Sequence, residues 1–324
     1  MSIRTLFVMD PLSRINVAGD STYMLMLEAA ARGWPIWWCT PGDLYADGGQ
    51  ACGRVHSVEV TRELPHFRSA SAQDLPLGFF DVVWMRKDPP FDMSYIFTTY
   101  LLDLVPSQTL VLNHPASLRS RNEKMYALQW EEFGPKTLVT REIARAIAFA
   151  REAPGKIVLK PWDGNGGRGV LVTQAGDGNL RSMLETLTRD GQDYVLVQHY
   201  LPEIAKGDKR IILIEGEPRG WMMRVPQAGD HRGNMHAGAR VEATELTPRE
   251  AALCAALGPR LREEGLVFVG IDVIGDHLTE INVTSPTGIQ EINRLMGTRL
   301  EVELTDAVLA RLATRRATSP PSGS

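Results

Sequence analysis

The fold is decided by residues 270–283, which read Gly270-Ile271-Asp272-Val273-Ile274-Gly275-Asp276-His277-Leu278-Thr279-Glu280-Ile281-Asn282-Val283. Two mostly apolar runs flank a short polar turn, which predicts a pair of antiparallel strands. Glu280 and Asn282 are two positions apart, so their side chains share one face of their strand, and Ile281 and Val283 share the other. Asp272 lies on the preceding strand.

The register of this hairpin decides whether the polar groups meet. A two-residue turn at 275–276 would pair Ile274 with His277 and place Asp272 on the face away from Glu280. A three-residue turn at 275–277 pairs Ile274 with Leu278 and sets Asp272 opposite Glu280. Because this second register also stacks Ile271 on Ile281 across one apolar face, we expect it.

In that register an Asp, a Glu and an Asn bring side-chain oxygens close together. Hard oxygen ligands of this kind suit Mg²⁺ that bridges nucleotide phosphates. The two opposed carboxylates favour a metal, because like charges across a strand pair are unfavourable without a cation between them. The alternative is a solvent-facing strand pair, in which polar and apolar residues alternate for no further reason.

A glycine-rich turn follows a second predicted strand, Ile157-Val158-Leu159-Lys160-Pro161. The turn reads Asp163-Gly164-Asn165-Gly166-Gly167-Arg168-Gly169. Glycines let backbone N–H groups approach an anion, and Lys160 adds a positive charge. The pattern is neither a Walker A loop nor a GxGxxG turn that opens a helix. A simple hairpin connection and a phosphate site both remain open.

Further cations lie along the chain, although its formal net charge is −4. Such a charge provides no global field for nucleic acid, so cations that hold anionic substrates must be concentrated locally. Lys124 lies near a helix start, and Arg86 and Lys87 end a buried strand, where charged residues often only mark emergence into solvent. Between residues 210 and 240 the chain carries Arg210, Arg224, Arg232 and Arg240.

Length and composition indicate a globular protein of two or three units, and the order of its strand and helix signals indicates the α/β (α+β) class. The chain has 324 residues, of which 44% are hydrophobic and 23% charged, enough for a large core. Cys39, Cys52 and Cys254 form no CxxC pair, which is typical of structural thiols in a reducing compartment. With no signal peptide or membrane span expected, we expect a cytoplasmic protein without a membrane or nucleic-acid partner.

Strand and helix signals divide the chain into an N-terminal open α/β unit over 1–121, a middle α+β unit over 122–200, a last unit over 201–316 and a disordered tail over 317–324. The expected elements of the first unit are strands 5–9, 35–40, 80–85 and 109–113 and helices 20–33 and 92–104. The middle unit should contain helices from 122, 141–152 and 179–188, a hairpin over 156–173 and a strand over 194–198. The last unit should contain strands 210–214 and 218–225, a mobile loop over 226–238, a helix over 248–264, the hairpin and a helix over 302–316.

Seven segments together resemble the bacterial glutathione synthetase family of the ATP-grasp superfamily. In chain order they are Val8-Met9-Asp10-Pro11, the run from Met85 to Asp92 (MRKDPPFD), Asn122-Glu123-Lys124, Leu159-Lys160-Pro161 with its glycine-rich turn, Gly207-Asp208-Lys209-Arg210, Arg232-Gly233-Asn234, and the run from Thr279 to Thr287 (TEINVTSPT). The match spans roughly residues 5 to 315, and MRKDPPFD and TEINVTSPT are not general ATP-grasp features.

The resemblance implies an ATP-grasp fold with an N-terminal domain of open α/β type, a central lid domain and a C-terminal domain. ATP would be gripped between the last two. By the family pattern Lys124 and Lys160 hold the phosphates, and Asp272, Glu280 and Asn282 bind Mg²⁺, with Mn²⁺ as a second possibility. The other residues expected at the nucleotide are Gly164, Gly166, Gly167, Gly169, Gln198, Tyr200, Leu201 and Asp208.

The implied reaction joins γ-glutamylcysteine to glycine while ATP becomes ADP and phosphate. A carboxylate is a poor acyl donor, so it is first converted to an acyl phosphate, a step that depends on positioning and on charge neutralisation by groups such as Lys160. Arg210 is expected to stabilise the oxyanion formed when glycine attacks. Arg224 and Arg232 are expected to bind substrate carboxylate, and Arg86 a carboxylate of the dipeptide.

The family also suggests a homotetramer. Two other functions remain open on the residues alone: another ATP-grasp carboxylate–amine ligase, and a non-catalytic nucleotide-binding protein.

Overall fold

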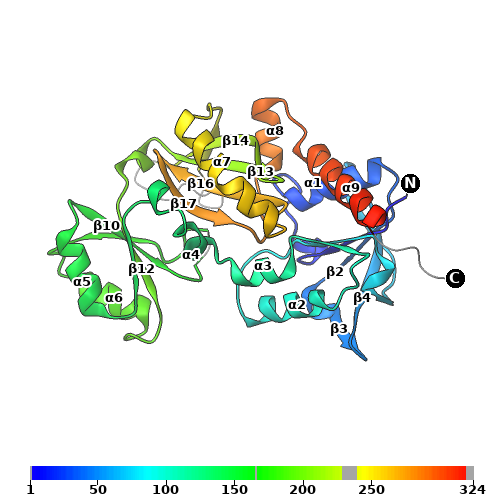
Figure 1. The fold of residues 1–324 in the computed structure, drawn as a ribbon, viewed down its shortest axis with the longest axis horizontal. Coiled ribbons are helices and arrows are strands. Elements are labelled where there is room, and N and C mark those ends of the chain that lie inside the picture. Colours follow the sequence, from blue (N-terminus) through cyan, green and yellow to red (C-terminus); the bar gives the residue numbers. More distant parts are fainter. Residues whose placement is uncertain (1, 165, 228–238, 319–324) are drawn as a thin grey trace.

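In the computed structural model, residues 2–164, 166–227 and 239–318 are described, and they form three β-sheets with flanking helices (Figure 1). Most of the loop expected over 226–238, including Arg232, lies outside the described residues, as do Asn165 and residues 319–324. None of the helices in the described ranges has the length and apolar character needed to cross a membrane.

The first sheet has the order β3-β4-β2-β1-β7-β8, with β5 and β6 also paired to β4. Its parallel part confirms the expected strands: β1 (Thr5–Val8), β2 (Ile36–Cys39), β7 (Val82–Met85) and β8 (Leu110–Leu112), with helices α1 (Ser21–Ala31), α2 (Met93–Asp103) and α3 (Pro115–Ser120). Asp20 caps α1, since its carboxylate accepts a hydrogen bond from the Tyr23 backbone N–H at 2.6 Å.

An antiparallel extension of this sheet was not expected from the sequence. It consists of β3 (Leu44–Asp47), β4 (Gln50–Val60), β5 (Phe67–Ser69) and β6 (Gln73–Pro76). Strands β3, β5 and β6 are short and mostly exposed, so their apolar pattern is weak, whereas β4 buries Ala51, Val55, Val58 and Val60 in an alternating pattern that the sequence does show. The pair Gly48-Gly49, both with positive φ, is a two-residue hairpin signal that could have revealed β3 and β4.

The middle sheet has the order β11-β10-β12-β9, built from β9 (Thr137–Thr140), β10 (Lys156–Pro161), β11 (Leu171–Gln174) and β12 (Val195–His199). The hairpin expected over 156–173 is confirmed, because β10 and β11 pair antiparallel. Helices α5 (Ile143–Glu152) and α6 (Leu180–Thr188) cover this sheet and share with it a hydrophobic cluster of its own.

The last sheet has the order β15-β14-β13-β16-β17. Its strands are β13 (Asp208–Ile214), β14 (Glu217–Val225), β15 (Arg240–Glu242), β16 (Phe268–Ile274) and β17 (His277–Asn282), and its helices are α7 (Pro248–Glu263), α8 (Ile289–Met296) and α9 (Leu300–Thr318). The closing helix, α9, begins two residues earlier and ends two residues later than expected, so residues 317 and 318 belong to this helix and not to the expected disordered tail.

The three-residue turn predicted for the β16–β17 hairpin is wrong. Ile274 pairs with His277 across a two-residue turn, yet Asp272 still pairs with Glu280 and Ile271 with Ile281, as expected. Both pairings are possible because the register shifts between Asp272 and Val273, where Thr279 is an extra residue in β17 without a partner in β16. A β-bulge of this kind returns the side chains beyond it to the faces that the apolar pattern demands.

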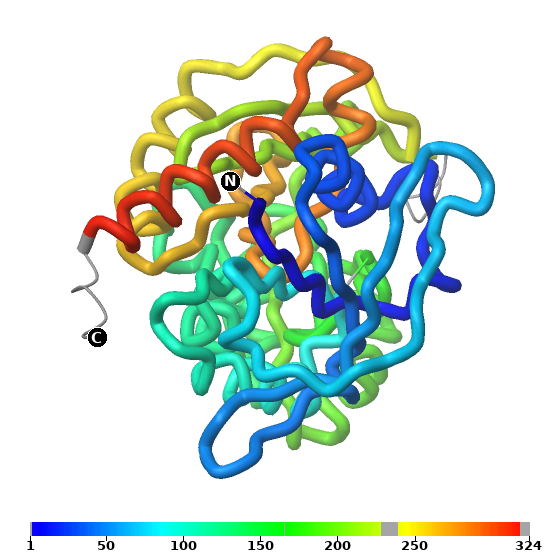
Figure 2. Tube along the Cα trace, turned by 90° about the vertical axis from the view of Figure 1, so that its right-hand side faces the viewer, coloured from blue at the N-terminus to red at the C-terminus, as the bar shows by residue number. Residues whose placement is uncertain are grey.

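The first and last sheets share their hydrophobic cores. One cluster joins Leu6 and Val8 to Ile271 and Ile281 and also contains Cys39 and Cys254. Helix α4 (Glu123–Ala127) packs on β17 rather than on the middle sheet. Helix α9 lies against α1 and beside the N-terminal segment (Figure 2). Its Arg316 donates a hydrogen bond to Asp81, the residue before β7.

Candidate active site

A cavity of about 770 Å³ lies where the three sheets meet. The middle sheet contributes residues of β10, β11 and β12, and the last sheet contributes β13, β14, β16 and β17. The loops around residues 14–20 and 88–90 and the start of α8 complete the wall. Segments distant in sequence therefore meet at one cavity, and such a cavity is the candidate for a ligand-binding or catalytic site.

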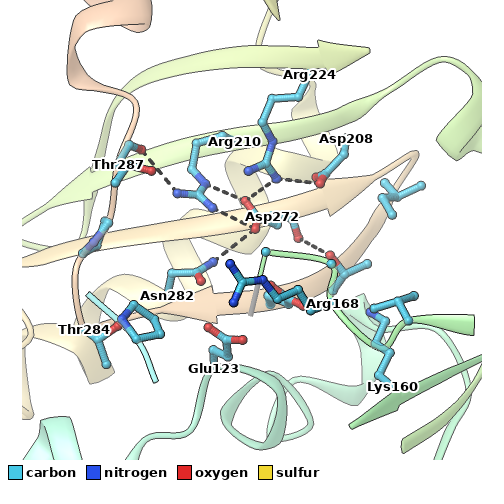
Figure 3. Close-up of a pocket in the computed structure, with 18 of the residues that line it drawn as sticks. Glu123, Lys160, Arg168, Asp208, Arg210, Arg224, Asp272, Asn282, Thr284 and Thr287 are labelled. Carbon is cyan, nitrogen blue, oxygen red and sulfur yellow. Dashed lines mark hydrogen bonds and ion pairs between the residues drawn. The ribbon is translucent and has the colours of Figure 1, made fainter. Parts of the chain in front are cut away.

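A network of buried charged side chains lines this cavity (Figure 3). Arg210 donates to both carboxylate oxygens of Asp272, from Nε at 2.6 Å and from Nη2 at 2.9 Å. Arg224 Nη2 lies 2.9 Å from Asp272 Oδ1 and donates to Asp208 Oδ2 at 2.5 Å. Asn282 Nδ2 donates to Asp272 Oδ2 at 3.1 Å. Asp272 is thus the shared acceptor of two guanidinium groups and one amide.

The charges in this network shift one another's pKa values. Burial alone would raise the pKa of Asp272, but Arg210 and Arg224 hold it well below its usual range. Burial raises the pKa of Asp208 to about 6, against the opposing charge of Arg224. Since one buried oxygen of Asp208, Oδ1, has no hydrogen-bond partner within the described residues, this carboxylate is available to a donor from a ligand.

A second charged group joins the middle and last sheets. Lys124 Nζ donates to Glu123 and to the carbonyl oxygen of Gly164 in the glycine-rich turn, and it lies 3.7 Å from Glu280. Burial lowers the pKa of Lys160, with the charge of Glu280 opposing that shift. Burial and the charge of Glu280 raise the pKa of Glu123 to about 7. In Figure 3, Lys160 and Glu123 face the strands that carry the arginine network.

The glycine-rich turn uses its glycines for specific reasons. A Cβ on Gly164 would come within 2.5 Å of Pro161 Cγ and 2.9 Å of the Arg168 carbonyl oxygen. Gly166, Gly167 and Gly169 have positive φ, a conformation that other residues rarely adopt. Gly166, Gly167 and Arg168 line the cavity, so the turn offers backbone groups and the Arg168 guanidinium to a ligand in the cavity.

Most residues expected at the site do line the cavity. They are Lys160, Gly166, Gly167, Gln198, Tyr200, Leu201, Asp208, Arg210, Arg224, Asp272, Glu280 and Asn282. Gly164, Gly169 and Lys124 are not among the described residues that line the cavity. Lys124 does form ion pairs with two residues that line it, Glu123 and Glu280. Arg232 lies outside the described residues.

Arg86 is placed differently from the expectation that it meets a substrate carboxylate. It is buried, is not among the described lining residues, and donates to Thr22 Oγ1 at 3.1 Å and to the Pro286 carbonyl oxygen at 2.9 Å. The loop that it holds does line the cavity, and the Thr287 carbonyl in that loop accepts from Arg210 Nη1 at 3.3 Å. Arg86 therefore supports the site from behind the loop.

The donor atoms present fit a hard cation. Glu280 and Asn282 bring carboxylate and amide oxygens to one wall of the cavity, beside Asp272, whose two oxygens already accept from Arg210, Arg224 and Asn282. Within the described residues no three Asp, Glu, His or Cys side chains form a metal-binding group. That result is compatible with Mg²⁺, which usually takes one or two carboxylates and completes its shell with water and substrate phosphates.

Several lining residues were not expected at the site. They are Arg14, Asn16, Gly19, Asp20, Asp88, Glu123, Arg168, Thr284, Ser285, Thr287 and Glu291. Glu123, Asp88, Arg168 and the 284–287 loop lie inside motifs that carry the family resemblance, which is a signal that could have identified them. Glu291 has no such signal, because only the packing of α8 brings it to the cavity.

Comparison with known proteins covers almost the whole chain. The family model described as prokaryotic glutathione synthetase, N-terminal domain, matches residues 3–119, and the one described as prokaryotic glutathione synthetase, ATP-grasp domain, matches residues 123–297. Glutathione synthetase of Pseudomonas aeruginosa is 46% identical over 97% of this chain and 100% of its own length. That of Escherichia coli strain K12 is 44% identical over 94% of this chain and 97% of its own length.

Solved structures share the fold at low sequence identity. The crystal structure of D-cycloserine synthetase DcsG has a TM-score of 0.64 at 16% identity and covers 95% of this chain and 99% of its own. D-alanyl-alanine synthetase A from Vibrio cholerae has a TM-score of 0.59 at 14% identity, covering 97% and 100%. These structures support the ATP-grasp fold and say nothing further about the reaction.

Proposed function

The chain belongs to the prokaryotic glutathione synthetase family, and we propose that the cavity between its three sheets is the active site of that reaction. The protein is an ATP-dependent ligase that joins γ-glutamylcysteine to glycine, giving glutathione, ADP and phosphate. The observation that carries the site assignment is the meeting of Lys160, Arg210, Asp272 and Glu280 around one cavity.

We propose that the middle sheet and the glycine-rich turn hold ATP against the last sheet. Gln198, Tyr200 and Leu201 form the wall for adenine, and Lys160 with Gly166 and Gly167 faces the phosphates. Lys124 acts from just behind the wall, where it ties the turn to Glu280. Phosphoryl transfer depends on positioning and charge neutralisation, which these groups supply.

ATP-grasp ligases use ATP with a divalent metal, and we propose Mg²⁺, with Mn²⁺ as a second possibility, held by Asp272, Glu280 and Asn282. The charge of the cavity supports this proposal, because its described lining residues include seven carboxylates and five Lys or Arg side chains. A polyanionic nucleotide would be repelled by such a wall without additional cations. When bound, the metal would neutralise phosphate charge.

Arg210 is our proposal for the group that stabilises the developing oxyanion. Its guanidinium is held by Asp272 and by the Thr287 carbonyl, and Arg210 lines the cavity. A preorganised donor of this kind costs no reorganisation when the charge develops. Arg224 is fixed between Asp208 and Asp272 and is proposed to bind substrate carboxylate, together with Arg232.

We also propose the domain division 1–121, 122–200 and 201–316 with a short tail. The separate hydrophobic core shared by the middle sheet, α5 and α6 supports the middle unit, whereas α4, which lies within the bounds 122–200, packs on β17 of the last sheet. We further propose a cytoplasmic homo-oligomer, a tetramer by family resemblance. Light scattering of the purified protein tests this, and a monomer mass would contradict it.

The function is tested by omitting one component at a time. ADP release should require ATP, Mg²⁺, γ-glutamylcysteine and glycine together, and glutathione should be the product. Turnover with a different acid and amine pair instead would favour another ATP-grasp ligase. ATP binding without turnover would favour a nucleotide-binding protein that is not an enzyme.

The metal assignment is tested by Glu280→Gln, which should abolish turnover while the circular dichroism spectrum stays unchanged. Asp276→Asn is the matched control, because it removes an exposed carboxylate from the turn of the same hairpin and should leave activity intact. Near-normal activity of Glu280→Gln would remove Glu280 from the metal site.

A further inference from the structure

A glycine stands in the middle of β16, at a position where a strand normally carries a side chain. Gly270 is buried and pairs with Ile212 of β13 on one side and with Asn282 of β17 on the other. It is not among the described glycines with positive φ, and the register shift in β16 comes later, between Asp272 and Val273. The backbone of β16 therefore does not require glycine at this position.

The space over Gly270 is taken by other side chains. A Cβ built on Gly270 would lie 3.2 Å from Arg210 Nη1, 3.3 Å from Arg210 Cδ and 3.3 Å from Pro286 Cβ, distances tighter than Cβ atoms normally make. A glycine inside a strand often marks a close approach by another group. At Gly270 the approaching group is mainly the side chain of Arg210.

The register of β13 and β16 explains why Arg210 lies over this position. Arg210 pairs directly with Asp272, and Gly270 is two residues before Asp272, so the two positions face the same side of the sheet. The Nε and Nη2 atoms of Arg210 donate to Asp272. The remaining nitrogen, Nη1, lies toward the diagonal neighbour of Arg210, which is Gly270.

A contact of Arg210 Nη1 depends on this space. Nη1 donates to the Thr287 carbonyl oxygen at 3.3 Å (Figure 3). The loop that carries this carbonyl is held from behind, since Arg86 Nη2 donates to the Pro286 carbonyl oxygen at 2.9 Å. A methyl group on residue 270 would press on both Arg210 and Pro286. Because Arg86 fastens the loop, we expect the guanidinium of Arg210 to move.

We propose that Gly270 is a positioning residue for Arg210: the missing side chain leaves the space in which the guanidinium lies when it meets the developing oxyanion. This inference rests on the proposed function and on the role of Arg210 in it. A donor of this kind is effective only when it is held within about 0.5 Å of the productive position. A methyl group on residue 270 would require a shift of a few tenths of an ångström, which approaches that limit.

The first test is Gly270→Ala, assayed with ATP, Mg²⁺, γ-glutamylcysteine and glycine. Its kcat should fall by about 10-fold, a part of the loss that follows complete removal of an oxyanion donor. KM for ATP should stay within about 2-fold of the wild-type value, because Arg210 acts in the transition state rather than on the bound nucleotide. A general loss of structure would not separate the two constants in this way.

The second test removes the side chain that the methyl group would displace. In Arg210→Ala the space over residue 270 is open, so adding Gly270→Ala to that variant should change its kcat by less than about 2-fold. The midpoint of thermal unfolding should behave in the same way, with the double variant more stable than the two single losses predict. If Gly270→Ala is too unstable to assay, the double variant should still fold.

Gly53→Ala is the matched control. Gly53 is a buried glycine of β4 in the first sheet, and a Cβ there would lie 3.0 Å from Leu44 Cδ2 and 3.4 Å from Val55 Cγ1. This variant should lose stability through similar crowding and keep the wild-type kcat. A crystal structure of Gly270→Ala provides a readout independent of turnover, in which Arg210 Nη1 should lie farther from the Thr287 carbonyl oxygen than the 3.3 Å of the wild type.

The outcomes separate this inference from the proposed function. If wild type does not join γ-glutamylcysteine to glycine, the proposed function fails. If wild type does so and Gly270→Ala keeps its kcat, or lowers kcat equally with and without the Arg210 side chain, the positioning role of Gly270 is overturned. An unmoved guanidinium in the crystal structure, an equal loss of kcat in Gly53→Ala, or a double variant that fails to fold would overturn it as well.

Discussion

Arg210 pairs with both oxygens of Asp272 through Nε and Nη2, and this pairing determines what its removal should do. In Arg210→Ala, Asp272 keeps Arg224 and Asn282 as partners, so the fold should survive. Turnover should fall by about 10²- to 10³-fold, the loss typical of one oxyanion donor. ATP affinity, measured by calorimetry, should change much less.

Arg210→Lys is the matched variant, because it keeps the charge without the fork and should recover only part of the turnover. Equal losses in turnover and in ATP affinity would assign Arg210 to ground-state nucleotide binding instead.

At the scale of elements, one contact brings the β13–β14 turn against α7 with no room for side chains. A Cβ on Gly258 of α7 would lie 2.6 Å from the Gly216 carbonyl oxygen. Gly258→Ala should therefore lower the free energy of unfolding by about 1 to 2 kcal/mol, despite the better helix propensity of alanine. Urea denaturation measures the difference.

Gly155→Ala is the control for that prediction, since a Cβ there meets nothing within 4 Å. Its effect should stay within about 0.5 kcal/mol. If both variants were equally stable, the close contact between the turn and α7 would be wrong.

A second contact between elements gives a pH dependence. Glu264 after α7 accepts from Arg121 Nε at 2.7 Å, from Arg121 Nη2 at 2.6 Å and from the Tyr126 hydroxyl at 2.9 Å. Burial alone would raise the pKa of Glu264, but these donors lower it. The stabilisation is therefore complete above the unfolded-state pKa of about 4.3 and is lost as the pH falls through the lower folded-state value.

Glu264→Gln should accordingly lower the free energy of unfolding by about 2 kcal/mol at neutral pH. The difference from wild type should shrink as the pH is lowered below about 4. Urea midpoints at several pH values provide the measurement, and a difference that stayed constant with pH would contradict the pairing.

At the scale of the whole molecule, the cavity joins a middle sheet with its own core to the shared core of the other two sheets. A ligand that spans the cavity should stabilise the assembly by mass action, by about 2.7 kcal/mol at 100 times its Kd. Thermal unfolding should therefore shift upward by several degrees with ATP and Mg²⁺ together.

Removal of the metal should largely cancel that shift, because the carboxylates of the cavity then face the triphosphate without neutralisation. ATP with EDTA, and Mg²⁺ without ATP, are the two controls. An equal shift for ATP with EDTA would separate nucleotide binding from the proposed metal site.

Much of the architecture follows from local sequence. The parallel strands of the first sheet, the β10–β11 hairpin and the alignment of Asp272 with Glu280 all agree with the apolar pattern. The β-bulge at Thr279 and the short strands β5 and β6 do not follow from it. Bulges and half-exposed strands are stabilised by their partners, so a single strand carries little sign of them.

The sequence by itself determined the family, through its motifs, together with the residue types of the site and many of the longer elements, because periodicity, caps and turns depend on neighbours within a few residues. Only the tertiary structure decided which charges meet. Arg210 pairs with Asp272 across two adjacent strands, Arg86 lies behind the 284–287 loop, and Glu291 reaches Gly19 through the packing of α8 on α1. Such contacts join residues far apart in the chain, and the burial of apolar faces, rather than any local pattern, brings them together.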